Sequence, residues 1–106
     1  MHPVEAQLIA YNAREIEPFM RCFAPDVRIL NGLGQVVLEG WEAKRERYAA
    51  AFINEPNVRC TVLHRIRHGD FVVDHEHLTG YRDGSEKHAV AIFRVRDGLI
   101  AQVQFL

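Results

Sequence analysis

Two histidines and two acids occupy consecutive positions, 74–77, inside the stretch FVVDHEHLTGY. An imidazole has an unperturbed pKa of about 6.5, so a histidine that faces an apolar cavity can act as a general acid or base near neutral pH. Three converging histidines can also hold zinc and leave a fourth position for water. The chemistry open to this stretch therefore depends on which face of its strand each side chain occupies.

The turn Gly69-Asp70 predicts a hairpin in which His64 lies opposite His75 and Arg65 lies opposite Asp74. Strict alternation along both strands then groups three histidines on one face: His64, His75 and His77. The opposite face carries most of the charges, including both acids of the stretch. Because charged side chains favour water, we expect the histidines to line an enclosed layer and the acids to form surface ion pairs.

The rest of the chain predicts the elements that hold these strands. Apolar residues repeat at helical spacing in three segments: 3–13, 16–24 and 41–54. Two short strands, 26–30 and 35–39, flank the turn NGLG, and glycine-containing turns divide 58–106 into four long strands. One-faced helices and a one-faced sheet must cover each other. The sequence predicts an α+β, two-layer domain with three N-terminal helices on a mostly antiparallel sheet of about six strands.

The strand after the histidine stretch allows two loop lengths. A three-residue loop at 83–85 turns four apolar residues inward: Ala89, Ala91, Phe93 and Val95. It also turns Arg94 and Arg96 outward, whereas a two-residue loop would bury both arginines, so we expect the longer loop. The pattern of the last strand leaves open which face carries Gln102 and Gln104.

Composition narrows the functional classes. The chain has 106 residues, 48% apolar and 25% charged, which predicts one domain spanning residues 1–106. Its net charge of -1 offers no attraction for nucleic acid or an anionic membrane. The first residues lack a signal-peptide pattern, and no apolar run approaches the ~20 residues that cross a bilayer, so we expect a cytoplasmic protein. Cys22 and Cys60 lack metal-ligand spacing and are expected to be reduced.

Four segments carry a family resemblance: FAPDVRIL, LEGWEAKRERYAAAF, VVDHEHLTG and FRVRDGLIAQVQF. With the order of elements, they resemble the nuclear-transport-factor-2-like superfamily, in particular its SnoaL-like and ketosteroid-isomerase-like proteins, over essentially the whole chain. The resemblance implies a cone-shaped fold with a curved sheet, a pocket for a small hydrophobic molecule, no metal and no cofactor. It implies no single activity, because this scaffold hosts isomerases, epoxide hydrolases, polyketide cyclases, dehydratases and binding domains.

Known catalytic residues of these families have no counterparts here. Asn31 stands where ketosteroid isomerases have their proton-shuttling carboxylate, and an amide cannot be that base. The two oxyanion donors of those enzymes correspond to Gln7 and Ala91, and only Tyr48 matches a supporting pocket tyrosine. In limonene-epoxide-hydrolase-like members, the arginine and aspartate of the same strand are replaced by His77 and Thr79.

Three interpretations of the histidines remain open: hydrogen-bonded wall residues, a general acid/base at His75 or His77, and a three-histidine zinc site. For the second, five residues are predicted to contact substrate: Asn31, Tyr48, His64, Thr79 and Phe93. The favoured function is an isomerase-, hydratase- or cyclase-type enzyme acting on a small hydrophobic molecule. The alternative is a binding module without catalytic activity.

We also expect a homodimer formed through the outer face of the sheet. On the predicted strands that face mixes charged residues with three apolar ones: Leu63, Val72 and Leu78. A mixed apolar and ionic surface of this kind suits a two-fold contact between identical chains.

Overall fold

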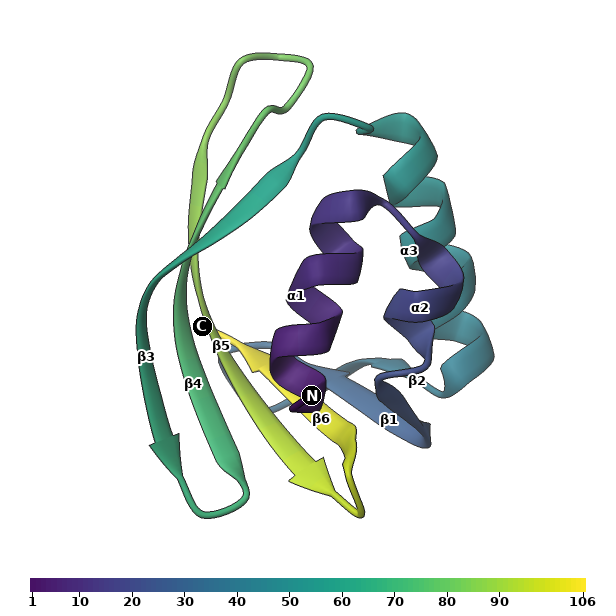
Figure 1. Ribbon diagram of the computed structural model, residues 1–106, viewed down its shortest axis with the longest axis vertical. Helices are drawn as coiled ribbons and strands as arrows, with labels where there is room; N and C mark the ends of the chain where they lie inside the picture. The colour runs from purple at the N-terminus through teal and green to yellow at the C-terminus, as the bar shows by residue number, and fades with distance from the viewer.

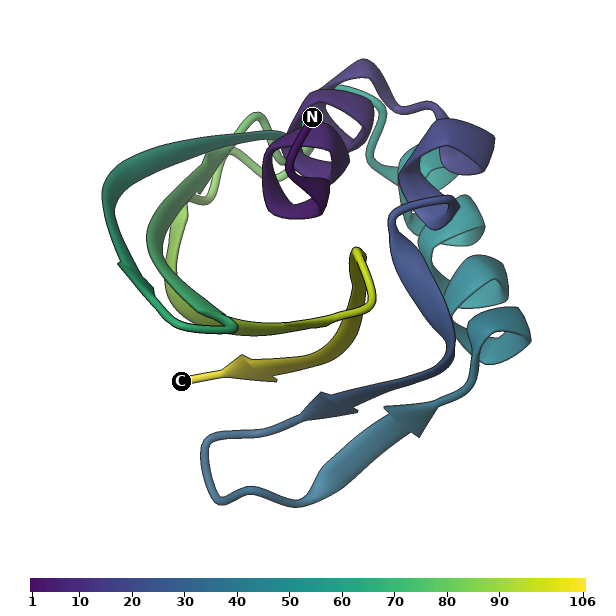
Figure 2. The ribbon, with the colours of Figure 1, turned by 60° about the horizontal axis from the view of Figure 1, so that its bottom comes forward.

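Three helices lie on the concave side of a strongly curved six-stranded sheet in the computed structural model, which describes residues 1–106 (Figures 1 and 2). The helices are α1 (Pro3–Ala13), α2 (Ile16–Met20) and α3 (Trp41–Asn54). The strands are β1 (Phe23–Leu30), β2 (Val36–Glu39), β3 (Arg59–His68), β4 (Phe71–Thr79), β5 (Lys87–Arg96) and β6 (Leu99–Phe105). The predicted α+β fold, with its cone-shaped sheet, is confirmed.

The strand order across the sheet is β2-β1-β6-β5-β4-β3, so the last strand of the chain pairs with the first. β1 and β6 run parallel, and every other neighbouring pair is antiparallel. The sheet curves so that α1 lies on the inner side of β3, β4 and β5, while α2 and α3 lie over β1 (Figure 2). No helix has the length and apolar character that a membrane span requires.

Aromatic side chains from several elements form the core between helices and sheet. The ring of Phe19 lies 4.9 Å from that of Phe23, 5.1 Å from Tyr48 and 5.4 Å from Phe52, measured between centroids. Offset and edge-to-face pairs at these distances are favourable beyond the burial of their area. This cluster fixes α2 and α3 against β1 and shapes one wall of the interior.

A β-bulge in β3 changes which side chains face the helices. The predicted pairs His64 with His75 and Arg65 with Asp74 are both present, but the register shifts between Val62 and His64. The extra residue reverses the alternation, because two residues of the bulged strand oppose one residue of its partner. Cys60 therefore points inward before the bulge and Arg65 points inward after it.

The expectation that the histidine face of the β3–β4 hairpin is enclosed is therefore wrong. Asp74 has 0% of its surface exposed and Glu76 has 7%, so the two acids face the interior. His64 is exposed, and His75 and His77 lie on the convex face, opposite Val90 and His88 of β5. The inward charge of Asp74 is tolerable because Arg65 pairs with it, which the distribution of charges along one strand did not reveal.

The orientation predicted for β5 is confirmed. Ala91 and Phe93 are buried, while Arg94 and Arg96 are exposed. The loop before this strand spans 80–86 and is longer than the predicted three residues.

The open question about β6 is also answered. Gln102 lies opposite the exposed Arg94 of β5, so it belongs to the convex face. Val103 lies opposite Phe93 on the inner face and is buried. Gln104, two residues after Gln102, shares its convex face and donates to the carbonyl oxygen of Asn31.

Candidate functional site

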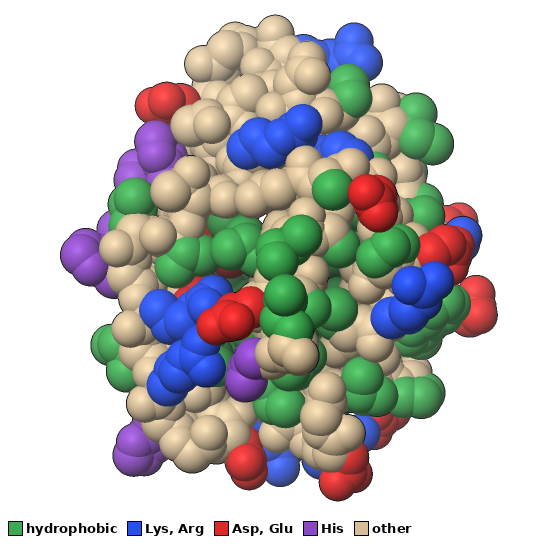
Figure 3. All heavy atoms as spheres, in the orientation of Figure 1, with side chains coloured by type: hydrophobic (Ala, Val, Ile, Leu, Met, Phe, Trp, Pro, Cys, Tyr) green, Lys and Arg blue, Asp and Glu red, His purple; other side chains and the backbone are tan.

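A cavity of about 150 Å³ lies between the helices and the concave face of the sheet. Most of its wall is apolar, from Leu8, Phe19, Phe23, Leu78, Ala89, Phe93, Val103 and Phe105. Six lining residues carry polar or ionisable groups: Gln7, Tyr11, Lys44, Tyr48, Cys60 and Glu76. In Figure 3, apolar side chains gather across the middle of the face seen in Figure 1, beside charged groups. A small, mostly apolar cavity with a few ionisable groups is the usual form of a small-molecule site.

Glu76 places a carboxyl group on this cavity from the middle of β4. Burial, followed by the negative charge of Asp74, raises its pKa to about 7, although the hydrogen bond with Cys60 and the charge of Arg65 oppose this rise. Both the acid and the carboxylate are thus populated near neutral pH, which suits a group that must accept and return a proton. Burial, followed by the charge of Glu76, also raises the pKa of Cys60 to about 12, so its thiol stays protonated.

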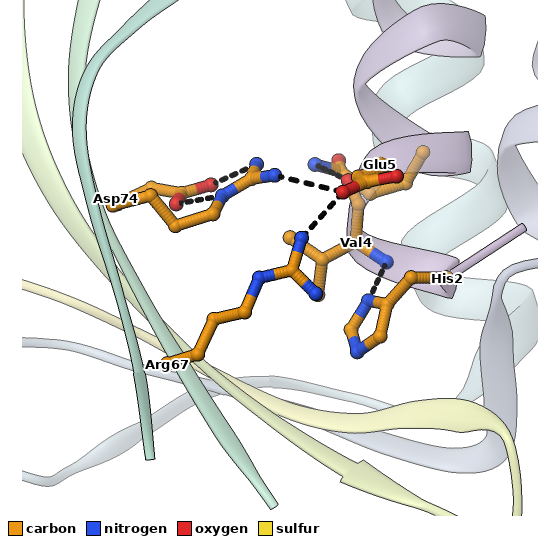
Figure 4. Close-up of polar contacts among 7 residues, drawn as sticks. His2, Val4, Glu5, Arg67 and Asp74 are labelled. Atoms are coloured by element: carbon orange, nitrogen blue, oxygen red, sulfur yellow. Dashed lines mark hydrogen bonds and ion pairs between the residues drawn. The ribbon is translucent and has the colours of Figure 1, made fainter.

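The charge of Asp74 is held inside by an ion-pair network that links β4, β3 and α1. Arg65 donates from Nε and Nη2 to the two carboxylate oxygens of Asp74, at 2.7 and 2.9 Å. Its Nη1 also lies 3.6 Å from Glu5 of α1, which pairs in addition with Arg67. Figure 4 shows Glu5 on α1 pointing toward the strands, where it contacts Arg67 and the guanidinium group that pairs with Asp74. The network fastens α1 to the sheet and keeps a fixed negative charge near Glu76.

Lys44 on α3 is 2% exposed, and its side chain reaches the cavity through a group of aromatic rings. Its Nζ atom lies 3.9 Å from the ring centroid of Tyr48, 4.1 Å from that of Phe23 and 5.2 Å from that of Phe19. Burial lowers its pKa to about 7. Burial also raises the pKa of the Tyr48 phenol, which therefore remains a hydrogen-bond donor.

Comparison with known proteins assigns the family. The family model described as the SnoaL-like domain matches residues 4–103. The chain belongs to the SnoaL-like domain family. No curated protein matches this SnoaL-like chain.

Solved structures share the fold over nearly the whole SnoaL-like chain. A cystatin-fold protein from Novosphingobium aromaticivorans is 28% identical, with a TM-score of 0.87 over 98% of this chain and 94% of its own. A candidate polyketide cyclase from Sinorhizobium meliloti is 21% identical, with a TM-score of 0.83 over 98% and 93%. A ketosteroid-isomerase-like protein from Catenulispora acidiphila, in complex with trimethylamine, is 20% identical, with a TM-score of 0.78 over 98% and 83%.

Two of the residues predicted from the sequence line the cavity of this SnoaL-like chain, Tyr48 and Phe93. Asn31 instead organises the turn between β1 and β2, where its Oδ1 accepts from the backbone N–H groups of Leu33 and Gln35, each at 3.0 Å. Thr79 ends β4 on the convex side and does not line the cavity. The placement of Asn31 and Thr79 at a pocket is therefore wrong.

His64, His75 and His77 also lie outside the cavity, on the convex face of the sheet. The rings of His64 and His75 stack at 5.9 Å, and those of His77 and His88 stack at 4.5 Å with an interplanar angle of 8°. His75 Nε2 lies 3.3 Å from His88 Nδ1. The rings lie side by side rather than converging on one point, and no group of three or more His, Cys, Asp or Glu residues has an arrangement that could hold a metal ion.

The sequence did contain a signal for the two ionisable residues that were missed. Lys44, Tyr48 and Phe52 recur every four residues, which places a lysine on the buried stripe of α3. Glu76 alternates on β4 with apolar residues at both ends of the same face, Val72 and Leu78. In each pattern a charged residue occupies a position that the neighbouring apolar residues mark as inward.

Proposed function

We propose that this SnoaL-like chain is an enzyme that moves a proton on a small, largely apolar carbonyl compound, with Glu76 as general acid and base. The observation that supports this most directly is the carboxyl group of Glu76, 7% exposed on an apolar cavity, with a pKa of about 7. A carboxyl group tuned to the working pH is what proton abstraction next to a carbonyl requires. The reaction class is an isomerisation, or the enolisation that precedes ring closure.

In this mechanism the carboxylate of Glu76 takes a proton from the carbon beside the carbonyl group. The electron pair of the broken C–H bond moves to the carbonyl oxygen as an enolate. Returning the proton to another carbon completes an isomerisation. The phenol of Tyr48, kept protonated by burial, lines the same cavity and can donate to the developing oxyanion.

The size of the cavity and the named relatives support a small-molecule substrate. A cavity of about 150 Å³ is the size of one that holds benzene. Among the solved structures with this fold are candidate polyketide cyclases and a protein in complex with trimethylamine. The acid/base role predicted for His75 and His77 stays an untested prediction, but their position on the convex face favours Glu76.

The proposal is tested by hydrogen–deuterium exchange of cyclohexanone in deuterated buffer, followed by proton NMR. We expect Glu76→Gln to lower the enzyme-dependent exchange rate by at least about 100-fold, because general base catalysis contributes that much or more. The wild-type rate should rise with pH through about 7 and then level off, because the carboxylate is the active form of a group with that pKa.

Glu46→Gln, at an exposed position of α3, is the matched control and should leave the rate unchanged. An unchanged rate in Glu76→Gln contradicts the role of Glu76. Cyclohexanone that binds without any exchange above the buffer rate supports the alternative function, a binding module without catalytic activity.

We further propose a homodimer formed through the convex face of the sheet. Two of the three apolar residues assigned to this contact from the sequence need correction, because Val72 is buried and Leu78 lines the cavity, whereas Leu63 is exposed. Ile66, 64% exposed, instead continues across the sheet into Val73 and Ile92. An apolar row flanked by polar residues resembles the core and rim of a protein interface.

In sedimentation at micromolar concentration, we expect the wild type to have twice the 12.2 kDa mass of one chain. Ile66→Asp should shift the protein to a monomer, because a carboxylate would be placed in the apolar centre of the contact. Ile53→Asp, at a 75% exposed position near the end of α3, is the control and should remain dimeric. A wild type that sediments as a monomer contradicts this proposal.

A further inference from the structure

We propose that Lys44 is a nucleophile that forms an imine with a small aldehyde or ketone bound in the cavity. The proposal shares with the proposed function only the requirement that a small carbonyl compound enters the cavity. It adds a covalent step and a reactive group that proton transfer by Glu76 does not need.

The surroundings of Lys44 suit a reactive amine better than a structural one. The side chain is almost completely buried, yet none of the chain's ion pairs involves it. Its Nζ atom is enclosed by rings from three elements, Phe19 of α2, Phe23 of β1 and Tyr48 of α3. A buried lysine kept for stability is normally paired with a carboxylate. Lys44 instead brings an unpaired amine to the wall of a cavity.

The protonation state of Lys44 also fits this role. Only a neutral amine attacks a carbonyl carbon, and an exposed lysine is almost entirely protonated at neutral pH. Burial lowers the pKa of Lys44 to about 7, and no neighbouring charge opposes that change. The aromatic faces around Nζ favour the ammonium form, so both forms are present near neutral pH.

The reaction involves no oxidation or reduction. The lone pair of Nζ forms a bond to the carbonyl carbon, and a proton moves from nitrogen to oxygen to give a carbinolamine. Protonation of the hydroxyl group and its loss as water leave the protonated imine. Glu76 and Tyr48 line the same cavity and can supply and take up these protons. The positive nitrogen then makes a proton on the adjacent carbon easier to remove.

The test uses benzaldehyde, which has no hydrogen on the carbon beside its carbonyl group, with sodium cyanoborohydride as the hydride donor. The hydride reduces the imine carbon, so the lysine gains one benzyl group that peptide mass mapping locates. The chain has two lysines, and the exposed Lys87 is an internal reference. At pH 7 we expect Lys44 to be labelled at least about tenfold faster than Lys87, because a larger fraction of its amine is neutral.

Two further measurements test whether labelling of Lys44 takes place in the cavity. Lys44→Arg keeps a cation among the aromatic rings but removes the nucleophile, so the benzyl group should disappear from position 44 while labelling of Lys87 and of the terminal amine of Met1 is unchanged. In the wild type, an excess of benzyl alcohol, which is close in size to benzaldehyde but cannot form an imine, should slow labelling of Lys44 and not of Lys87. This second measurement does not depend on the folding of any variant.

The outcomes separate this proposal from the role of Glu76. Lys87→Arg should leave labelling of Lys44 unchanged, whereas Glu76→Gln should slow that labelling without abolishing it, because Tyr48 and water can still exchange the protons. Labelling of Lys44 no faster than that of Lys87 at any pH from about 6 to 9 would overturn the imine proposal. Exchange of cyclohexanone that depends on Glu76 could still be found in that case, and the proposed function would stand. Conversely, fast labelling of Lys44 without any exchange that depends on Glu76 would contradict only the role of Glu76.

Discussion

Replacing Lys44 with methionine is expected to stabilise the fold by up to about 5 kcal/mol at pH 6, because methionine fills similar space without a buried amine. The pKa of Lys44 falls from 10.5 in the unfolded chain to about 7 in the folded protein. Between these values the unfolded chain holds a proton that the folded chain has released. The stability of the wild type therefore rises with pH across this window, and the full cost of burial is present below pH 7.

Urea denaturation at pH 6, 8 and 10 measures the difference in the free energy of unfolding between Lys44→Met and the wild type. The advantage of Lys44→Met should be largest at pH 6 and should shrink toward zero as the pH rises past 10.5, because the amine then becomes neutral in the unfolded chain as well as in the folded protein. Lys87→Met is the control, and as a surface substitution it should change the free energy of unfolding by less than about 0.5 kcal/mol. A gain that is equal at all three pH values would contradict the burial of a titrating amine.

Replacing Arg65 with methionine is expected to have the opposite effect and to destabilise the fold by about 3–5 kcal/mol. Arg65 makes both hydrogen bonds to the carboxylate of Asp74, whose side chain is 0% exposed. Without the guanidinium group, that carboxylate remains in the interior with no opposite charge beside it. The loss of stability comes mainly from leaving the buried carboxylate of Asp74 without an opposite charge, and less from removing a favourable contact.

Two variants distinguish this cause from a general effect of losing an arginine. Arg67→Met removes an arginine that is 51% exposed and pairs with Glu5, so it should cost less than about 1 kcal/mol. The double variant Arg65→Met/Asp74→Leu removes both charges and should recover most of the lost stability. A double variant that is no more stable than Arg65→Met would show that packing of Arg65, and not the charge of Asp74, determines the loss.

The location of the elements was determined largely by the sequence. The bounds predicted for α1 and α3 agree with the structure, because Pro3 begins the first helix and Gly40 marks the start of the second. The turn Gly69-Asp70 fixed the pairing of β3 with β4 through local backbone geometry. The inward position of Phe93 followed from the need to keep the neighbouring arginines in water. Each of these inferences depends on residues close together in the chain.

The tertiary structure alone decided which ionisable groups face the cavity. The bulge before His64 reverses the alternation by one residue, and a pattern of period two contains no sign of such an insertion. Asp74 then faces inward beside Arg65, and the guanidinium group of Arg65 also pairs with Glu5, on a helix from the other end of the chain. Whether a charged side chain can be buried depends on groups far away in sequence, so the inward positions that the apolar patterns mark for Glu76 and Lys44 were decided only when the layers packed together.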